Sequence, residues 1–190
     1  MFADIVIVEE SQVSQELNAK LKKLLCKCFP KDKAVFSETR YWNNVPPKWP
    51  VAIEEDDSPI ACCAVIERQI NIADKPYIIT GIGNVCVDPD YRGKGLAKKI
   101  LVQAMIEAEN RGYDFGILFC KEKIKDVYEK MGWLLISNTD IVRLNENGQP
   151  QSWNLWRGQD VMMYFPLKTE KLPQGVIHLN GLNWQGRSVL

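Results

Sequence analysis

The chain has 190 residues, 46% of them hydrophobic, which is long enough for one domain with a substantial core, so we expect a single domain over 1–190. Lysine plus arginine and aspartate plus glutamate both total 24, so zero formal charge favours neither nucleic acid nor an anionic membrane as partner. The start, MFADIVIVEE, lacks the features of a signal peptide, and no apolar stretch approaches bilayer length. These observations predict a cytoplasmic protein.

The first half of the chain predicts a short strand, DIVIV, then a helix and then further strands. Ser11 is the expected cap of a helix that Pro30 stops. The apolar face of this helix consists of Val13, Leu17, Leu21, Leu24, Leu25 and Cys28. The turn sequences DDSP and ADKP then separate three predicted strands, at 51–55, 60–72 and 76–87.

The second half alternates helices and strands. A helix ending near Gly112 precedes the apolar strand FGILFC, and a short helix at 122–131 ends at Gly132, its expected cap. WLLI and DVMMYFPL predict two more strands, between which lies the polar segment RLNENGQPQSWNLWRGQ, and the tail from Pro166 is expected to be irregular. This order predicts an α/β (α+β) fold, a mixed sheet with helices on its faces.

The six cysteines do not have the spacing of a disulfide framework. Cys26 and Cys28 should point to different sides of a helix, and Cys62 and Cys63 to opposite faces of a strand. There is no C-x-x-C motif, and His178 is the only histidine. We therefore expect reduced thiols in the core and no metal site.

A basic, glycine-containing loop, DPDYRGKGLAKK at 88–99, joins a strand to a helix. The P-loop template requires G-K-[ST], but here Gly95 follows G-K, and the dinucleotide template G-x-G-x-x-G also fails. A third template, [Q/R]-x-x-G-x-[G/A], is filled by Arg92, Gly95 and Ala97. Free amides at a helix start, the helix dipole and nearby lysines would together bind an anion. The pattern alone also fits an ordinary solvated turn.

Two segments resemble motifs of the GNAT superfamily of N-acyltransferases. NVCVDPDYRGKGLAKKIL resembles its acyl-CoA-binding signature, and VYEKMGW at 127–133 resembles its short helix with a tyrosine. The resemblance covers about residues 80–133. It implies a GNAT-like single domain, with a mostly antiparallel twisted sheet of about six to seven strands and about four helices. It also implies an N-acetyltransferase that uses acetyl-CoA and no metal.

The resemblance further implies which residues hold the cofactor. Backbone amides of the loop and helix start would bind the pyrophosphate of coenzyme A, at Arg92, Gly93, Lys94, Gly95, Leu96 and Ala97. The arginine side chain would then have a structural role. The preceding strand would pair with the pantetheine arm through Val85, Cys86 and Val87, and one of its amides would polarise the thioester carbonyl. A plain core strand is compatible with this role, because only the main chain is used.

Tyr128 is the implied general acid, which would protonate the leaving thiolate while the substrate amine attacks the thioester directly. Its spacing from Ile124, Val127 and Met131 also fits a core tyrosine. Many relatives have an asparagine seven residues before this tyrosine and a small residue four before it. Here those positions are Lys121 and Ile124, which leaves the packing beside the pantetheine arm open.

The general base is not assigned. In many relatives a carboxylate near the central strands takes the proton of the amine, but the residues just before Val85 are Gly83 and Asn84. Glu67, Glu54 and Glu55 lie on neighbouring predicted strands. For these three carboxylates a solvated strand face is the favoured interpretation.

The acceptor is a small-molecule or peptide amine of open identity. The chain more weakly resembles the aminoglycoside 2′-N-acetyltransferases, through AVIERQINI, VYEKMGW and a tail that ends near Trp184. Trp153 and Trp156 would then line a substrate pocket, with Glu146 and Asp160 at its edges, although packing is the commoner role of such tryptophans.

Two functions of other classes compete with this one. A non-catalytic module that binds or senses acyl-CoA on the same fold would explain the missing base. A nucleotide-binding protein would use the same loop, although both nucleotide templates fail. An exposed edge strand could also pair two copies in a homodimer.

Overall fold

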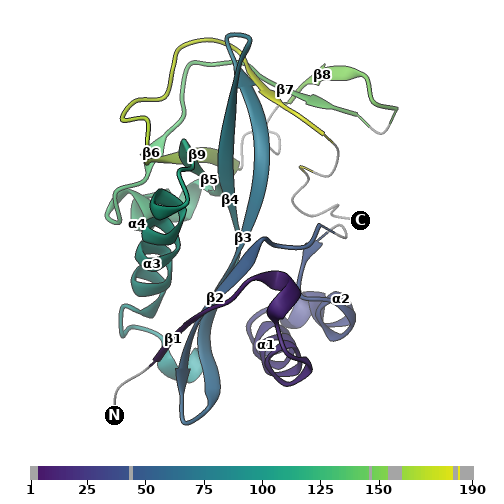
Figure 1. The fold of residues 1–190 in the computed structure, drawn as a ribbon, viewed down its shortest axis with the longest axis vertical. Coiled ribbons are helices and arrows are strands. Elements are labelled where there is room, and N and C mark those ends of the chain that lie inside the picture. The colour runs from purple at the N-terminus through teal and green to yellow at the C-terminus, as the bar shows by residue number, and fades with distance from the viewer. Residues whose placement is uncertain (1–3, 43–44, 146, 154–159, 182–183, 185–190) are drawn as a thin grey trace. The chain divides into compact units, whose positions relative to one another are not determined.

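The structure is a computed structural model that describes residues 4–42, 45–145, 147–153, 160–181 and 184 (Figure 1). Contacts divide the chain into two compact units. Unit 1 comprises Met1–Ile66 and Ile82–Ala104, and unit 2 comprises Glu67–Gly81 and Met105–Leu190. Two long strands and one helix therefore contribute residues to both units. The prediction of a single domain over 1–190 stays a prediction.

Helix α1 of unit 1, Gln15–Cys28, buries Leu21, Leu24 and Leu25 of the predicted apolar face, but Val13 lies before the helix and the cap is a different residue. The Ser14 hydroxyl accepts a hydrogen bond from the Leu17 amide at 3.1 Å, so Ser14 caps the helix. The prediction of Ser11 was wrong, because residues Glu10–Gln12 form a separate 3₁₀ turn, η1. A second turn, η2 at Pro30–Asp32, leads into α2 at Lys33–Glu38.

The sheet of unit 1 has the strand order β1-β2-β3-β4. These strands are β1 Asp4–Ile7, β2 Trp49–Glu55, β3 Ser58–Ile72 and β4 Lys75–Val87, of which β3 and β4 continue into unit 2. The β2–β3 turn has positive φ at Asp56 and Asp57, as a tight hairpin requires. Helices α1 and α2 cover this sheet through one buried cluster: Leu21, Leu24, Leu25, Phe36, Ala52, Cys62 and Cys86.

In unit 2 the strand order is β6-β9-β5-β4-β3-β10-β7-β8. The strands that lie wholly in this unit are β5 Phe115–Lys121, β6 Leu134–Leu135, β7 Ile141–Leu144, β8 Pro150–Ser152, β9 Asp160–Pro166 and β10 Ile177–Leu179. The prediction of an irregular tail from Pro166 was therefore wrong in part, because β10 lies in this tail and pairs antiparallel with β3 and parallel with β7. The strands β7 and β8, which were not predicted, pair antiparallel with each other.

Two helices follow the loop in sequence. Helix α3, Leu96–Asn110, ends as predicted just before Gly112. A 3₁₀ turn, η5 at Glu122–Ile124, precedes the short α4, Lys125–Glu129. The predicted apolar face of α4 is not core, since the exposed fraction is 39% for Ile124 and 50% for Val127.

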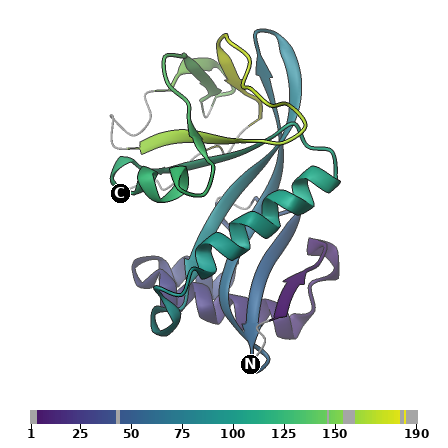
Figure 2. The same cartoon turned by 90° about the vertical axis from the view of Figure 1, so that its left-hand side faces the viewer.

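The predicted fold class is confirmed: a mixed, mostly antiparallel curled sheet is flanked by four helices (Figures 1 and 2). The described residues contain ten strands, more than the six to seven expected, because β7, β8 and β10 lack a clear alternating pattern. No helix in the described ranges has both the length and the apolar character needed to cross a bilayer.

Candidate active site

The loop at 88–95 adopts a backbone that requires glycine. Gly93 has φ 79° and Gly95 has φ 74°, in the left-handed region that other residues rarely adopt. At both positions an added Cβ would meet nothing within 4 Å. The glycines are therefore needed for their backbone angles, and the space in front of the loop is open.

The start of α3 presents free main-chain donors. The first hydrogen bond at this end runs from the Lys99 amide to the Gly95 oxygen, at 3.1 Å. In the described part of the chain, the amides of residues 96–98 precede that bond and have no such acceptor. Leu96 is 6% exposed and anchors this turn in the core, while Lys94, Lys98 and Lys99 are exposed. Free amides, a helix dipole and positive charge form a cradle for an anion.

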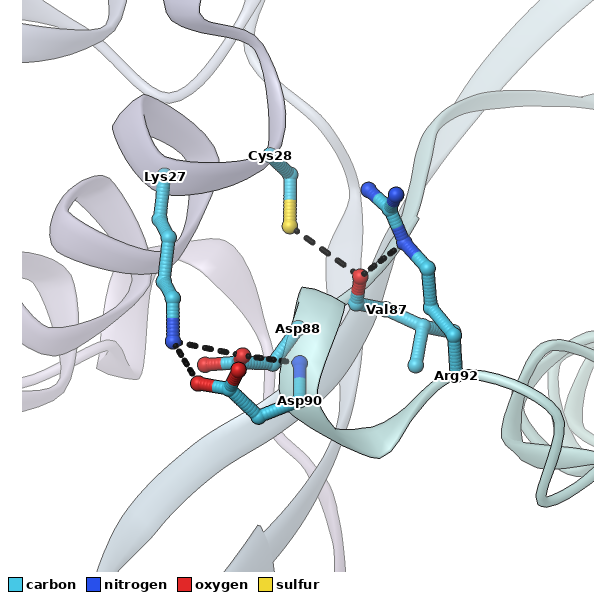
Figure 3. A network of polar contacts seen from close by, with 6 residues as sticks. All are labelled: Lys27, Cys28, Val87, Asp88, Asp90 and Arg92. Atoms are coloured by element: carbon cyan, nitrogen blue, oxygen red, sulfur yellow. Dashed lines mark hydrogen bonds and ion pairs between the residues drawn. The ribbon is translucent and has the colours of Figure 1, made fainter.

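An ion-pair cluster holds the entry to this loop (Figure 3). The Lys27 Nζ, in the last turn of α1, lies 2.6 Å from Asp88 Oδ1 and 2.7 Å from Asp90 Oδ2. The Asp88 carboxylate also accepts a hydrogen bond from the Asp90 amide at 3.0 Å and caps the 3₁₀ turn η4, Pro89–Tyr91. Bonds to Asp88 and then Asp90 raise the pKa of Lys27. Burial opposes ionisation of Asp88, but its bonds to Lys27 and the Asp90 amide leave the pKa of Asp88 lowered.

The Val87 carbonyl, the last of β4, accepts two hydrogen bonds. The Cys28 thiol of α1 donates one at 3.4 Å, and the Arg92 Nε donates the other, also at 3.4 Å (Figure 3). The Arg92 side chain thus folds back onto the strand that precedes the loop. This contact agrees with the structural role expected for it.

Tyr91 connects the loop to β2 and to Lys94. The Lys94 Nζ lies 4.6 Å from the centroid of the Tyr91 ring, within the range of a cation–π contact. A hydrogen bond to Glu55 raises the pKa of Tyr91. Glu55, one of the carboxylates considered as a base, is therefore occupied by a loop tyrosine.

The strand Val85–Val87 contains a thiol that is not a nucleophile. Cys86 is 6% exposed, and its Sγ lies 3.5 Å from the Cys62 Sγ. A hydrogen bond with Cys28 lowers the pKa of Cys86, but the bond with Cys62 and burial outweigh it and raise the pKa overall. Burial likewise raises the pKa of Cys63 to about 12. Such thiols stay protonated, so they do not attack a thioester at neutral pH.

All six cysteines are free thiols. The two pairs point as predicted: the Cys26 thiol contacts the Lys33 oxygen, whereas the Cys28 thiol contacts the Val87 oxygen. Within the ranges described, no group of three or more His, Cys, Asp or Glu side chains is placed to hold a metal ion.

Asn84 occupies an unusual position in β4, directly before Val85. Its φ is 54°, which is typical of a β-bulge inside a strand. Its Nδ2 donates a 2.7 Å hydrogen bond to the carbonyl of Arg40, a 6% exposed residue whose guanidinium binds Asn18 and Glu10. The Asn84 Oδ1 is buried without a partner among the described residues. Asn84 is one of the residues that line a small cavity of about 10 Å³, room for about one water.

Tyr128 lies on α4, in unit 2. Its ring packs edge-on against Trp133, with centroids 6.4 Å apart, and its carbonyl accepts hydrogen bonds from the Met131 and Trp133 amides. Gly132, with φ 93°, ends this segment as predicted. Lys121 forms an ion pair with Asp160, so a charged pair occupies the position where many relatives have asparagine.

The other predicted site residues have packing partners. Glu67 accepts a hydrogen bond from the Tyr113 hydroxyl, and this bond occupies the second carboxylate considered as a base. Trp153 packs on Phe119, with ring centroids 5.0 Å apart. The Arg143 guanidinium lies over the Trp153 ring, 5.0 Å from its centroid. Trp156 and Glu146 lie outside the described residues.

Residues 85–97 lie in unit 1 and Tyr128 lies in unit 2, and the cofactor and acid roles expected for them stay predictions. The sequence did not indicate Lys27 or Cys28. Both lie about sixty residues before their partners Asp88 and Val87, and no local pattern links positions so far apart. The sequence offered one signal for Lys27, a lysine in the last turn of a predicted helix. Such a lysine is usually explained by its favourable interaction with the helix dipole.

Residues 11–136 match a family model described as "Acetyltransferase (GNAT) domain". The chain belongs to this GNAT acetyltransferase family, so the resemblance predicted from its motifs is confirmed. No curated protein matches the chain.

Solved structures with the same fold span nearly the whole chain. The GNAT family N-acetyltransferase YhbS from Escherichia coli, solved in complex with CoA, has a TM-score of 0.65 and 14% identity over 94% of this chain and 89% of its own. E. coli ElaA has a TM-score of 0.59 and 14% identity over 86% and 99%. The E. coli ribosomal-protein-S18-alanine N-acetyltransferase has a TM-score of 0.55 and 15% identity over 87% and 96%. At these identities the likeness establishes the fold.

Proposed function

We propose that the protein transfers an acetyl group from acetyl-CoA to a primary amine, by direct attack within a ternary complex. The family establishes the general activity of an acyl-CoA-dependent N-acetyltransferase. The observation that carries the finer proposal is the open amide cradle at the start of α3, next to two glycines with positive φ. When bound, acetyl-CoA would supply a thioester carbonyl that an amine can attack.

The cradle fits the diphosphate of coenzyme A. A diphosphate needs several donors at close range, and the amides of residues 96–98 meet this need next to two glycines, which have no side chain. Lys94, Lys98 and Lys99 add positive charge beside them. In the proposal, the amides of Val85, Cys86 and Val87 hold the pantetheine arm, and one of them stabilises negative charge on the carbonyl oxygen.

Direct transfer is favoured over a covalent acyl-enzyme. The cysteine in the proposed cofactor strand, Cys86, is buried and has a raised pKa, so it lacks the thiolate that a covalent route needs. Tyr128 Oη would hold the proton that the leaving sulfur takes up. The ring of Tyr128 is supported by Trp133, and its helix is solvent-accessible on one side, which suits a group that exchanges a proton.

A non-catalytic acyl-CoA-binding module is the second candidate. It is favoured because two carboxylates considered as the general base are hydrogen-bonded to tyrosines, Glu67 to Tyr113 and Glu55 to Tyr91. Asn84, directly before Val85, has an amide side chain, which cannot act as a base. This candidate predicts coenzyme binding without turnover. Transfer of acetyl to any member of a broad amine panel would reject it.

Calorimetry of acetyl-CoA binding tests the proposed cofactor site. The informative variant is Gly95→Asn, because asparagine tolerates positive φ better than most residues, so the fold should survive while a side chain covers the cradle. Gly148→Asn is the matched control. Gly148 has φ 73° and equally open surroundings, but it lies between β7 and β8 in unit 2.

We expect wild type and Gly148→Asn to bind acetyl-CoA in the micromolar range, and Gly95→Asn to bind at least about tenfold more weakly, through loss of close backbone contacts. Equal binding by Gly95→Asn would remove the loop from the cofactor site. No binding by folded wild type would overturn the proposal.

A further inference from the structure

The last turn of α1 holds the strand-to-loop junction at two points. Lys27 pairs with Asp88 and Asp90, and Cys28 donates to the Val87 carbonyl (Figure 3). These contacts fix three successive features of the junction: the last carbonyl of β4, the residue that caps η4, and a residue within η4. The loop glycines begin two residues after η4.

We propose that Lys27 is a positioning residue for the cofactor, which sets the affinity for the diphosphate end of acetyl-CoA through Asp88 and Asp90. This inference rests on the proposed function. Lys27 acts through the loop, and no direct contact with the cofactor is required of it.

The electrostatic reason lies in the two carboxylates. Asp88 and Asp90 lie at the entry to a loop whose proposed ligand is an anion, so left unpaired they would oppose its binding. A single ammonium lies within 2.7 Å of both and neutralises part of that charge. The Asp88 side chain is only 14% exposed, so water screens it poorly and its pairing matters more than that of the 76% exposed Asp90.

The geometric reason lies in the freedom of the loop beyond the junction. An added Cβ at Gly93 or Gly95 would meet no atom within 4 Å, so these glycines gain no support from packing on that side. The contacts of Lys27 at the entry, together with those of Tyr91 and Arg92, therefore set the direction of the loop. A lysine that bridges Asp88 to Asp90 holds η4 in one arrangement, which reduces the entropy lost when amides order around a ligand.

The same helix supplies a matched control. Lys20 also bridges two carboxylates, with its Nζ 2.8 Å from Glu16 and 2.6 Å from Asp57. Its pairs raise the pKa of Lys20, as the pairs of Lys27 raise that of Lys27. Asp57, however, lies in the β2–β3 turn and not in the loop. Lys20→Met therefore removes a similar double ion pair without touching the proposed cofactor site.

The experiment measures the affinity of the full chain for acetyl-CoA by calorimetry, and for acetyl-pantetheine, which lacks the diphosphate, by ligand-observed NMR. We expect Lys27→Met to weaken acetyl-CoA binding about three- to tenfold, the range of two partly exposed ion pairs, and to leave acetyl-pantetheine binding unchanged. Lys20→Met should stay within about twofold of wild type for both ligands, and Lys27→Arg should restore acetyl-CoA binding.

A second variant separates charge from general disruption. In Lys27→Met the carboxylates of Asp88 and Asp90 are both left without their ammonium partner. Adding Asp90→Asn removes one of these two charges, so about half of the change in log Kd for acetyl-CoA should be recovered. Thermal melts identify any variant that fails to fold. For Lys27→Met we expect a midpoint close to that of Lys20→Met.

Three outcomes would overturn the inference: unchanged acetyl-CoA affinity in folded Lys27→Met, an equal loss in Lys20→Met, or an equal loss of acetyl-pantetheine affinity. Failure of the proposed function is distinguishable, because wild type itself would then bind no acetyl-CoA.

Discussion

The loop at 88–95 of unit 1 and the α4 segment of unit 2 carry the two family motifs, and the proposed function uses them in different ways. In the loop the groups proposed to bind the cofactor are main-chain amides, and side chains from distant parts of the sequence hold the backbone that presents them. In the α4 segment the group proposed to act is the side-chain hydroxyl of Tyr128, on a five-residue helix with an exposed apolar face.

Because of this difference, the two regions should tolerate different substitutions. A site made of amides should accept many side-chain changes but few changes of backbone angle. A site made of one hydroxyl should lose its activity when that oxygen is removed, even if the backbone is undisturbed. The predictions below test this contrast, beginning with the largest expected effect.

The largest effect should come from Tyr128→Phe. Loss of the proposed proton donor should lower kcat by about a hundredfold or more, while the affinity for acetyl-CoA stays the same. Steady-state kinetics with a reactive amine would measure this, with Tyr164→Phe on β9 as the control. An unchanged kcat at every pH would refute the acid role and break the contrast.

Backbone geometry in the α4 segment should matter through packing. Gly132→Ala should destabilise the protein by about 1–3 kcal/mol, since φ is 93° and the new Cβ would lie 3.2 Å from the Phe165 ring. Gly112→Ala has a similar φ, 80°, but no atom within 4 Å of the new Cβ. Urea denaturation should therefore show a smaller loss for Gly112→Ala, and equal losses would remove the contribution of Phe165.

Asn84, which has a positive φ directly before Val85, should allow backbone angle and side-chain contact to be separated in the same way in unit 1. Asn84→Ala should destabilise by about 1–2 kcal/mol, through the lost hydrogen bond to Arg40 and the positive φ. Asn84→Gly loses the same bond but tolerates the φ, so it should be less harmful by a few tenths of a kcal/mol or more. Chemical denaturation of both variants measures the difference, and the reverse order would show that φ is not the cause.

The smallest effect should come from Lys94→Met in the loop itself. If amides do most of the binding, removing this exposed charge should weaken acetyl-CoA binding by less than about fivefold at physiological salt. A loss of a hundredfold in calorimetry would mean that a side chain dominates the site, and the contrast between the two regions would disappear.

Local patterns were enough to predict the long elements and the loop. The 3.6-residue apolar period predicted α1, and β-branched runs between turn residues predicted β2, β3 and β4. The loop was predictable because its requirement is local: glycines at fixed positions between a strand and a helix. The three short strands β7, β8 and β10 were missed because three or four residues are too few to show a period.

Features that depend on distant residues could not be predicted. The pairing of Lys27 with Asp88, the thiol contact of Cys28 with Val87 and the bond from Asn84 to Arg40 all join positions far apart in sequence. The exposure of Ile124 and Val127 was missed for a related reason, since an apolar face predicts burial only when another element covers it.

The place of β10 has a consequence for how the protein is made. Ile177 pairs with both Ile72 and Ile141, so this strand lies between β3 and β7 in unit 2. During synthesis about a hundred residues are added after β3 before β10, its neighbour at this edge, has been made. A nascent or truncated chain would meanwhile expose unpaired main-chain groups beside Ile70 and Ile72, both fully buried at the end. An unpaired strand edge of this kind promotes aggregation, so a chain that ends before β10 should aggregate more readily than the full chain.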